Sequence, residues 1–250
     1  MNPLIEINNL VKYFDLGQGQ IVHAVDGVSL HINSKEVVGL VGESGSGKST
    51  LLDLIPRLYD PSQGKILIDG INIKDYKLEE LRSVMGFVPQ NTFLFSESIE
   101  DNIRFGDRNS SKESIEKATK KAAVHQNISD FKENYKTLLG ERGVTLSGGQ
   151  IQRISLARAL VKNPKILLLD DCLSAVDTDT EEQILKHLKL INKNKTIIIV
   201  SHRISSIKHA NQIIVFKKGE IIQQGKHAEL IKTSGYYKEL FEKQKIDIKK

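Results

Sequence analysis

The chain of 250 residues is 39% hydrophobic and 27% charged, a composition that fits a globular protein and excludes disordered and fibrous classes. Its longest apolar runs, such as Ile166–Leu169 and Thr196–Val200, are far shorter than the roughly 20 residues that cross a bilayer, and the opening residues lack a signal-peptide pattern. The lysines behind the net charge of +5 are spread along the chain and densest at its end, so we expect a solvated helical tail, no nucleic-acid binding and no direct membrane insertion.

The first strong signal along the chain is the short β-rich run Glu36–Gly42, which a glycine-rich loop follows. After the loop, leucine and isoleucine recur at helical spacing as far as Leu58. This strand–loop–helix order frames the sequence "GESGSGKST", Gly42–Thr50, which matches the pattern G-x-x-x-x-G-K-[ST] of a phosphate-binding loop.

The residue types in this loop suit a triphosphate and its metal ion. Glycine lets the backbone amides approach phosphate oxygens, Lys48 can reach the β- and γ-phosphates, and the Ser49 hydroxyl can bind Mg²⁺. A flexible Gly/Ser turn is the alternative, but the flanking strand and helix favour a nucleotide site. The predicted ATP-binding residues of the loop are Gly42, Ser44, Gly45, Ser46, Gly47, Lys48, Ser49 and Thr50.

Further elements follow in order. Gly64–Ile73 predicts a strand, a turn at Asp69 and Gly70, and a return strand, and "VMGFVPQ" predicts a short strand that Pro89 ends. The stretch from Ser110 to Glu133 is rich in helix formers and begins a helical insertion, whose last helix is expected over "GGQIQRISLARALVKN".

The runs "KILLLDD" and "KTIIIVSH" are apolar without alternation, which is typical of central parallel strands covered on both faces. Asp170 ends the first of these runs, where a doubly wound sheet places its ligand crevice, and it is the candidate acid for Mg²⁺. A lone aspartate there is usually a turn or a cap, but the phosphate loop upstream favours the metal. We interpret Cys172 as a buried core residue.

The sequence "LSGGQ", Leu146–Gln150, provides a second glycine-rich helix start, although one nucleotide hardly needs both. Together with "GESGSGKST", "FVPQ", "ILLLDD", "SAVD" and "IIIVSH" in this order, it resembles the ATP-binding cassette (ABC) ATPases over about the whole chain from Leu4 to Gln244.

The resemblance implies an α/β fold: a P-loop NTPase (RecA-like) core with an antiparallel β-subdomain and an inserted α-helical subdomain. The expected parts are residues 1–90 for the first part of the core with the β-subdomain, 91–162 for the helical subdomain with the signature sequence, and 163–250 for the rest of the core with a helical tail.

The resemblance also implies roles for residues outside the loop. Gln90 would reach Mg²⁺ and the attacking water, and His202 would contact the γ-phosphate; a buried histidine at the end of a strand is the alternative for His202. Two cassettes would dimerise head to tail, with the signature segment of one contacting the γ-phosphate held by the other and Asp177 coupling the two sites. The signature residues are Ser147, Gly148, Gly149 and Gln150.

An aromatic side chain near the N-terminus stacks on adenine in this family. Counting along "NLVKYF" selects Phe14, with Tyr13 as its neighbour. A core aromatic on a strand explains Phe14 almost as well.

Two positions depart from the family pattern. Exporters have glutamate where "TLLGERG" places Leu138, which affects coupling to the membrane partner. Asp171 stands where the family has the glutamate that polarises the attacking water, and its side chain is shorter by one C–C bond, about 1.5 Å. Because a general base must lie within about 3 Å of its proton, we expect slow hydrolysis with ATP binding and dimerisation retained. Asp171 as a cap of the following turn is the alternative.

The segment before Leu51 resembles importer ATPases, and the remainder resembles lipid- or drug-type exporter cassettes. A chimera or an excised cassette explains this difference and the lack of a fused membrane domain. The sequence therefore predicts an ATP-hydrolysing subunit, cytoplasmic and peripheral at the cell membrane, that pairs with a second cassette and a transmembrane partner, with export favoured over import. A nucleotide-gated dimerisation module with little hydrolysis and a soluble non-transport ABC ATPase are the alternatives.

Overall fold

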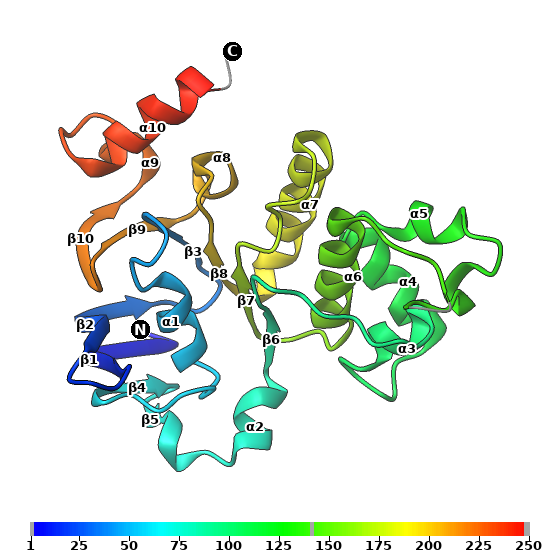
Figure 1. Ribbon diagram of the computed structural model, residues 1–250, viewed down its shortest axis with the longest axis horizontal. Helices are drawn as coiled ribbons and strands as arrows, with labels where there is room; N and C mark the ends of the chain where they lie inside the picture. Colours follow the sequence, from blue (N-terminus) through cyan, green and yellow to red (C-terminus); the bar gives the residue numbers. More distant parts are fainter. Residues whose placement is uncertain (1–2, 141–142, 248–250) are drawn as a thin grey trace. The chain divides into compact units, whose positions relative to one another are not determined.

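The computed structural model describes residues 3–140 and 143–247 (Figure 1). Glu141 and Arg142 of the "GERG" sequence and the last three residues of the expected helical tail lie outside the described residues. Contacts divide the chain into two compact units, Met1–Val84 with Thr196–Lys250, and Met85–Lys195. The predicted boundaries of the three functional parts stay a prediction.

The first unit contains an antiparallel sheet of four strands in the order β2-β1-β4-β5, as predicted for the β-subdomain. Its central strand β1 has polar and apolar residues in alternation at its start, so Ile5 and Ile7 are fully buried and Glu6 is not. The strands are β1 (Ile5–Asp15), β2 (Ile21–Ile32), β4 (Gln63–Ile68) and β5 (Ile71–Asn72).

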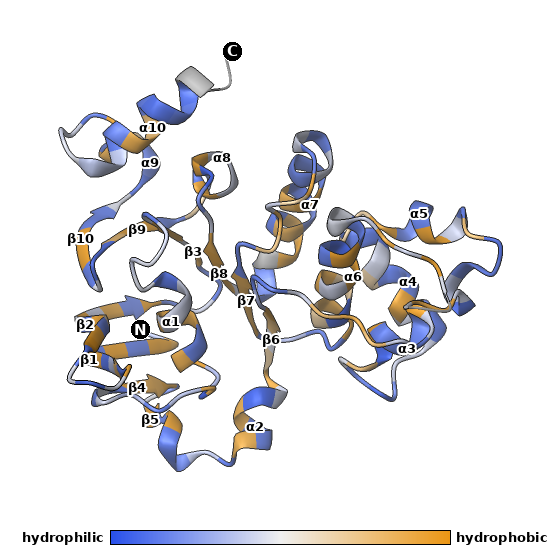
Figure 2. Ribbon diagram, in the orientation of Figure 1, coloured by the Kyte–Doolittle hydropathy of each residue, from blue (hydrophilic) through white to orange (hydrophobic). Residues whose placement is uncertain are grey.

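A second group of strands in this unit forms the nucleotide-loop side of the fold. Strand β3 (Val37–Val41) pairs in parallel with β8 (Thr196–Val200) and with β9 (Gln212–Lys217), and β10 (Glu220–Gly225) is antiparallel to β9. All five residues of β8 are buried, and Figure 2 shows the hydrophobic residues that run along this strand. The expectation of a central parallel strand without alternation is confirmed.

Six short helices complete the described part of the first unit. They are α1 (Lys48–Leu54), the 3-10 helix Ile73–Asp75, α2 (Leu78–Ser83), α8 (Ile204–Ile207), α9 (His227–Leu230) and α10 (Tyr236–Asp247). The return strand β5 is shorter than predicted, because the Asn72 side chain accepts a hydrogen bond from the Lys74 backbone amide and begins the 3-10 helix there.

The second unit contains the helical insertion. Strands β6 (Met85–Val88) and β7 (Ile166–Asp170) pair in parallel. The long helix α6 packs against α3 and α4, and Ser98 and Ser111 cap the first turns of those two helices through their hydroxyl groups. The helices are α3 (Ile99–Arg104), α4 (Lys112–Lys121), α5 (His125–Ser129), the 3-10 helix Asn134–Lys136, α6 (Gly148–Val161), α7 (Thr178–Ile191) and the 3-10 helix Asn192–Asn194.

Helix α1 ends earlier than the leucine pattern predicts, in a turn built around Arg57. Arg57 has a left-handed backbone with φ 53°. Its amide donates to the Leu54 carbonyl, and the Leu58 amide donates to the Asp53 carbonyl, which is the hydrogen-bond pair of a Schellman ending. The apolar spacing therefore continues beyond the helix that it predicts.

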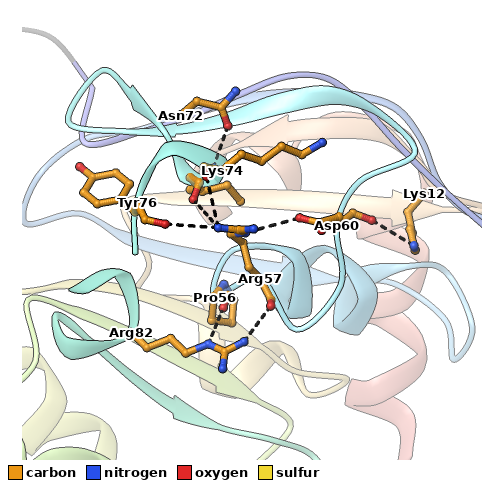
Figure 3. Close-up of polar contacts among 9 residues, drawn as sticks. Lys12, Pro56, Arg57, Asp60, Asn72, Lys74, Tyr76 and Arg82 are labelled. Atoms are coloured by element: carbon orange, nitrogen blue, oxygen red, sulfur yellow. Dashed lines mark hydrogen bonds and ion pairs between the residues drawn. The ribbon is translucent and has the colours of Figure 1, made fainter. Parts of the chain in front are cut away.

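The Arg57 side chain joins this turn to the segment after β5 (Figure 3). Its guanidinium donates to the carbonyls of Ile73 at 3.1 Å and Tyr76 at 3.4 Å. Arg82 in α2 donates to the carbonyls of Pro56 at 2.9 Å and Arg57 at 2.8 Å. The two arginines thus satisfy backbone acceptors that a turn between helices would otherwise leave to water.

We expect Arg57→Met to lower the free energy of unfolding by about 1–3 kcal/mol, because the aliphatic stem remains while several backbone carbonyls lose their donor. Urea unfolding followed by circular dichroism measures this. Lys74→Met is the matched control, since Lys74 is exposed and its change should fall within about 0.5 kcal/mol of wild type. Equal effects of the two substitutions would show that the Arg57 contacts do not stabilise the turn.

No helix in the described part of the chain is long and apolar enough to cross a membrane.

Candidate functional site

Gly42–Gly47 connects β3 to α1, and Lys48–Thr50 begins α1, so the loop sequence Gly42–Thr50 lies between a strand and a helix as predicted. Gly47 has φ 100°, and a Cβ atom at this position would lie 1.9 Å from the Ala24 carbonyl oxygen in β2. A Cβ at Gly42 would lie 2.3 Å from the Phe216 carbonyl oxygen in β9. The loop therefore runs against the backbones of two strands, and side chains at these two glycines would push it away from them.

Lys48 begins α1 and folds its side chain back into the loop. Its ammonium group donates to the carbonyl oxygens of Gly42 at 2.9 Å and Glu43 at 2.7 Å, and to the Ser46 hydroxyl at 2.9 Å. The residue is only 8% exposed. The loop thus holds a buried positive charge at its centre, which suits the recognition of an anion such as a phosphate group.

The turn between β9 and β10 is hydrogen-bonded to the loop. The Gly219 amide donates to the Ser46 carbonyl at 3.0 Å, and the Gly219 carbonyl accepts from the Asp26 amide at 2.9 Å. Ser44 and Gly45 are exposed, whereas Ser49 and Thr50 in the first turn of α1 are half-buried. The exposed side of the loop is therefore the side that a ligand can reach.

Phe14 lies near the end of β1 and is half-buried, outside the fully buried core. Its ring packs edge-on against Tyr59, with 5.5 Å between the centroids, and the Lys12 ammonium lies 5.0 Å from the Phe14 centroid. The core explanation for Phe14 is therefore weaker than the sequence alone indicated. The stacking of adenine on this residue stays a prediction.

His202 follows β8 and is exposed, so the alternative of a buried histidine is wrong. Strand β8 runs parallel to β3 with Leu40 opposite Val200, and the Ser201 amide donates to the Leu40 carbonyl at 3.1 Å. The fold thus places His202 and the start of the phosphate loop at the carboxyl ends of two neighbouring strands, the edge where open parallel sheets bind ligands.

In the second unit, Gln90 comes after β6 and Asp171 comes directly after β7. These two strands are parallel neighbours, since Val88 of β6 lies opposite Leu169 of β7. Asp170 is the last residue of β7 and is 4% exposed, whereas Gln90 is exposed. Cys172 is buried, which raises the pKa of its thiol and confirms that it is a core residue.

Asp171 has a left-handed backbone with φ 44°, and its carbonyl accepts from the Ser174 amide at 3.3 Å. Left-handed backbone outside glycine costs energy and often marks a functional position. The residue thus begins the turn that follows β7 through its backbone, and its side chain is half-buried. Its catalytic role stays a prediction.

The signature segment begins α6 through a reciprocal cap. The Ser147 hydroxyl accepts from the Gln150 amide at 3.3 Å, and the Gln150 side chain accepts from the Ser147 amide at 2.9 Å. A Cβ atom on Gly149 would lie 2.8 Å from the Ala175 carbonyl oxygen. Gly149 therefore lets α6 approach the loop that ends at Asp177.

Gln152 fastens the same loop to α6, and sequence reasoning missed it. Its side chain accepts from the Ala175 amide at 2.9 Å and donates to the Ser174 hydroxyl at 3.0 Å. Gln152 is 7% exposed. A glutamine among the apolar residues of α6 was the available signal, because a buried amide needs partners.

Asp177 caps α7. Its carboxylate accepts from the Thr180 backbone amide at 3.0 Å, and this hydrogen bond holds the pKa of Asp177 below its usual value. The residue is exposed, so a partner can still reach it. The cap gives Asp177 a structural role beside the predicted role in dimer coupling.

The residues predicted to bind Mg²⁺ supply the donors that this ion prefers, since Ser49 offers a hydroxyl, Asp170 a carboxylate and Gln90 an amide oxygen. Among residues 3–140 and 143–247, no cluster of three or more His, Cys, Asp and Glu side chains could hold a metal ion without a further ligand. Oxygen donors of these types suit Mg²⁺, which usually keeps several waters and binds substrate phosphates.

Comparisons with known proteins agree with this geometry. A profile described as ABC transporter matches residues 25–174. The chain is 45% identical over 243 residues to a Bacillus subtilis protein named as a putative multidrug export ATP-binding/permease protein, YgaD, covering 97% of this chain and 41% of that protein. It is 49% identical over 227 residues to the uncharacterized ABC transporter ATP-binding protein YknU of the same organism, covering 91% of this chain and 39% of that protein.

Among solved structures, the chain resembles one titled "Structure of a bacterial Atm1-family ABC exporter with ATP bound", with a TM-score of 0.90 and 38% identity over 97% of this chain and 42% of that one. The chain spans about two fifths of the length of these relatives. Because single exporter-type relatives match nearly all of the chain, a chimera is not needed to explain its opening segment.

We expect Gly47→Ala to abolish ATP binding, because the new Cβ would overlap the Ala24 carbonyl and displace the loop. Fluorescence titration with a labelled ATP analogue measures this. Gly70→Ala is the matched control: Gly70 also has positive φ, 78°, but has nothing within 4 Å of its Cβ position. The control should bind ATP as the wild type does, and normal binding by Gly47→Ala would contradict the described loop.

Proposed function

The chain belongs to the ABC transporter ATP-binding family. We propose that it binds and hydrolyses ATP to drive an exporter-type transporter. The observation that carries the proposal is the buried Lys48 ammonium, held by three oxygen atoms of the glycine-rich loop. Exporter relatives at 38–45% identity support the exporter type.

In this proposal the loop Gly42–Thr50 binds the triphosphate, and Phe14 stacks on the adenine. Lys48 exchanges loop oxygens for phosphate oxygens, which keeps the buried charge paired when the nucleotide binds. His202 contacts the γ-phosphate and stabilises the charge that develops there. Ser49, Asp170 and Gln90 would hold Mg²⁺, which would neutralise phosphate charge when bound.

Asp171 acts as the general base toward the attacking water. Its carboxylate begins about 1.5 Å closer to the backbone than that of the glutamate usual in the family. Because a base works within about 3 Å of the proton or through one water, this loss slows hydrolysis while nucleotide binding persists.

Two copies of the chain, or this chain and a related cassette, dimerise head to tail on ATP. The signature residues then serve the partner's nucleotide. Support comes from the reciprocal cap at Ser147 and from the contacts of Gly149 and Gln152, which join α6 to the loop carrying Asp177. The signature and Asp177 thus reach a partner as one surface.

A transmembrane domain is the second partner. Phe93 and Phe105 expose 66% and 58% of their surface, and both pack beside Phe95 in one aromatic patch. The Arg158 guanidinium lies 5.6 Å from the Phe95 ring and donates to the Phe93 carbonyl at 2.8 Å, which holds the patch in place. Leu138, the predicted departure in coupling, is 56% exposed in the same unit. An exposed apolar patch of this kind fits a docking surface for a membrane-domain loop.

A second candidate function follows from Asp171. If hydrolysis is negligible, the chain is a nucleotide-gated dimerisation module, with turnover indistinguishable from buffer and ATP-dependent dimers.

We expect Asp171→Glu to raise ATP turnover by about tenfold or more and Asp171→Asn to lower it by a similar factor, because the first restores the reach of the base and the second removes it. Phosphate release measures both. Size-exclusion chromatography with light scattering, with and without ATP and Mg²⁺, is the control for binding and dimerisation. If glutamate is no faster and asparagine no slower, Asp171 is not the base.

We expect Phe93→Ser with Phe105→Ser to abolish stimulation of ATP turnover by the membrane domain of an exporter, because both exposed rings leave the patch. Turnover of the isolated chain should not change. Leu16→Ser, which alters a residue that is 65% exposed in the other unit, is the control and should keep the stimulation. If only importer permease subunits stimulate ATP turnover, the proposed coupling to an exporter is wrong.

A further inference from the structure

Helix α10 is fixed to the first unit by its second residue. Tyr237 is fully buried. Its hydroxyl shares a hydrogen bond of 2.8 Å with the His227 ring, and its amide donates to the Gln223 side chain at 2.9 Å. Phe241, one turn later, packs edge-on against His227 with 5.2 Å between the ring centroids. The direction of α10 is therefore set by contacts within the described chain.

Gln244 lies on the same face of α10, seven residues after Tyr237. Its side-chain amide donates to the His202 carbonyl oxygen at 2.6 Å, and its side-chain oxygen accepts from the Ile204 backbone amide at 2.9 Å. The nitrogen and the oxygen of the Gln244 side-chain amide therefore both bind the backbone of the segment His202–Ile204. A glutamine that brackets a segment in this way restricts the backbone on both sides of Arg203.

The segment needs this partner because α8 lacks a side-chain cap. Arg203 stands at the cap position of α8 without a capping hydrogen bond from its side chain. The first amides of a helix have no partner within it, and Ile204 is buried, so its amide cannot rely on water. Gln244 supplies the acceptor, while the Ser201 hydroxyl accepts from the Arg203 amide at 3.0 Å.

The start of α10 also packs against the end of β9. Burial and the Glu43 carboxylate raise the pKa of the Tyr236 phenol to about 12. The Lys217 ammonium, from the end of β9, lies 5.3 Å from the centre of the Tyr236 ring. One helix thus contacts the end of β9 and the segment that carries His202.

We propose that Gln244 is a positioning residue that orients His202 for ATP hydrolysis from the C-terminal helix. The proposal rests on the catalytic role of His202 in the proposed function. Gln244 holds the His202 carbonyl and the Ile204 amide, on either side of Arg203, so its loss would let the backbone that carries His202 move without removing the histidine side chain. Displacing a reacting group by about 1 Å can slow a reaction about a hundredfold.

The test compares Gln244→Met, which keeps the length of the side chain but loses both hydrogen bonds, with Lys243→Met, which alters an exposed neighbour on the same helix. We expect Gln244→Met to lower kcat about tenfold with KM for ATP changed less than twofold, since the binding loop is intact. Lys243→Met should match the wild type. Wild-type turnover by Gln244→Met would overturn the proposal.

A double-mutant cycle separates positioning from general support of the fold. In the His202→Ala background, Gln244→Met should cost no further turnover, because the group that it orients is absent. A full tenfold loss in that background would overturn the proposal. The cycle is repeated in the Asp171→Glu background, where faster turnover is expected.

Hydrogen exchange at the Ile204 amide, read by nuclear magnetic resonance, tests the contact without catalysis. We expect exchange at least about tenfold faster in Gln244→Met than in Lys243→Met, because the buried amide loses its acceptor. Unchanged exchange would overturn the proposal. If His202→Ala turns over as the wild type does, the assigned role of His202 fails and positioning fails with it, whereas failure of the Gln244 variant alone leaves the proposed function intact.

Discussion

The buried positive charge of Lys48 is the constraint that the nucleotide loop is built around. A cation that is 8% exposed must be paired with oxygen atoms, and the loop supplies them from its own backbone and from Ser46. Those carbonyls can turn inward only if the loop lies close against β2 and β9, which Gly47 and Gly42 permit. Glycine at these two positions therefore keeps the loop where its oxygen atoms pair with Lys48.

The loop and the strands beside it could largely be predicted from the sequence, because their residue types follow recognisable patterns. Apolar runs without alternation predicted β7 and β8, and the glycine pattern between a strand and a helix predicted the loop before Lys48. The ends of elements were harder to predict, since α1 stops at Leu54 and β5 at Asn72 although the apolar spacing continues. Local hydrogen bonds at Arg57 and Asn72 decide those boundaries, and the spacing of apolar residues does not reveal them.

The positions that sequence reasoning missed are glutamines that join distant segments. Gln152 binds a loop 22 and 23 residues away, and Gln244 binds backbone 40 and 42 residues away. Their partners are backbone groups and a serine hydroxyl, which carry no identifying pattern, so only the fold reveals them. His202, after β8, is the opposite case. Its residue type indicated a functional role, but its exposure could not be predicted from the sequence.

Cys172, next to the acid pair, is the single cysteine of the chain. Burial both shields its sulfur and raises the pKa of its thiol, and the thiolate is the form that reacts with alkylating reagents. The folded chain therefore has no cysteine that reacts readily with alkylating reagents among its described residues. A cysteine introduced at an exposed position, and carrying a spin label or a fluorophore, would report distances between two copies without any prior removal of native thiols.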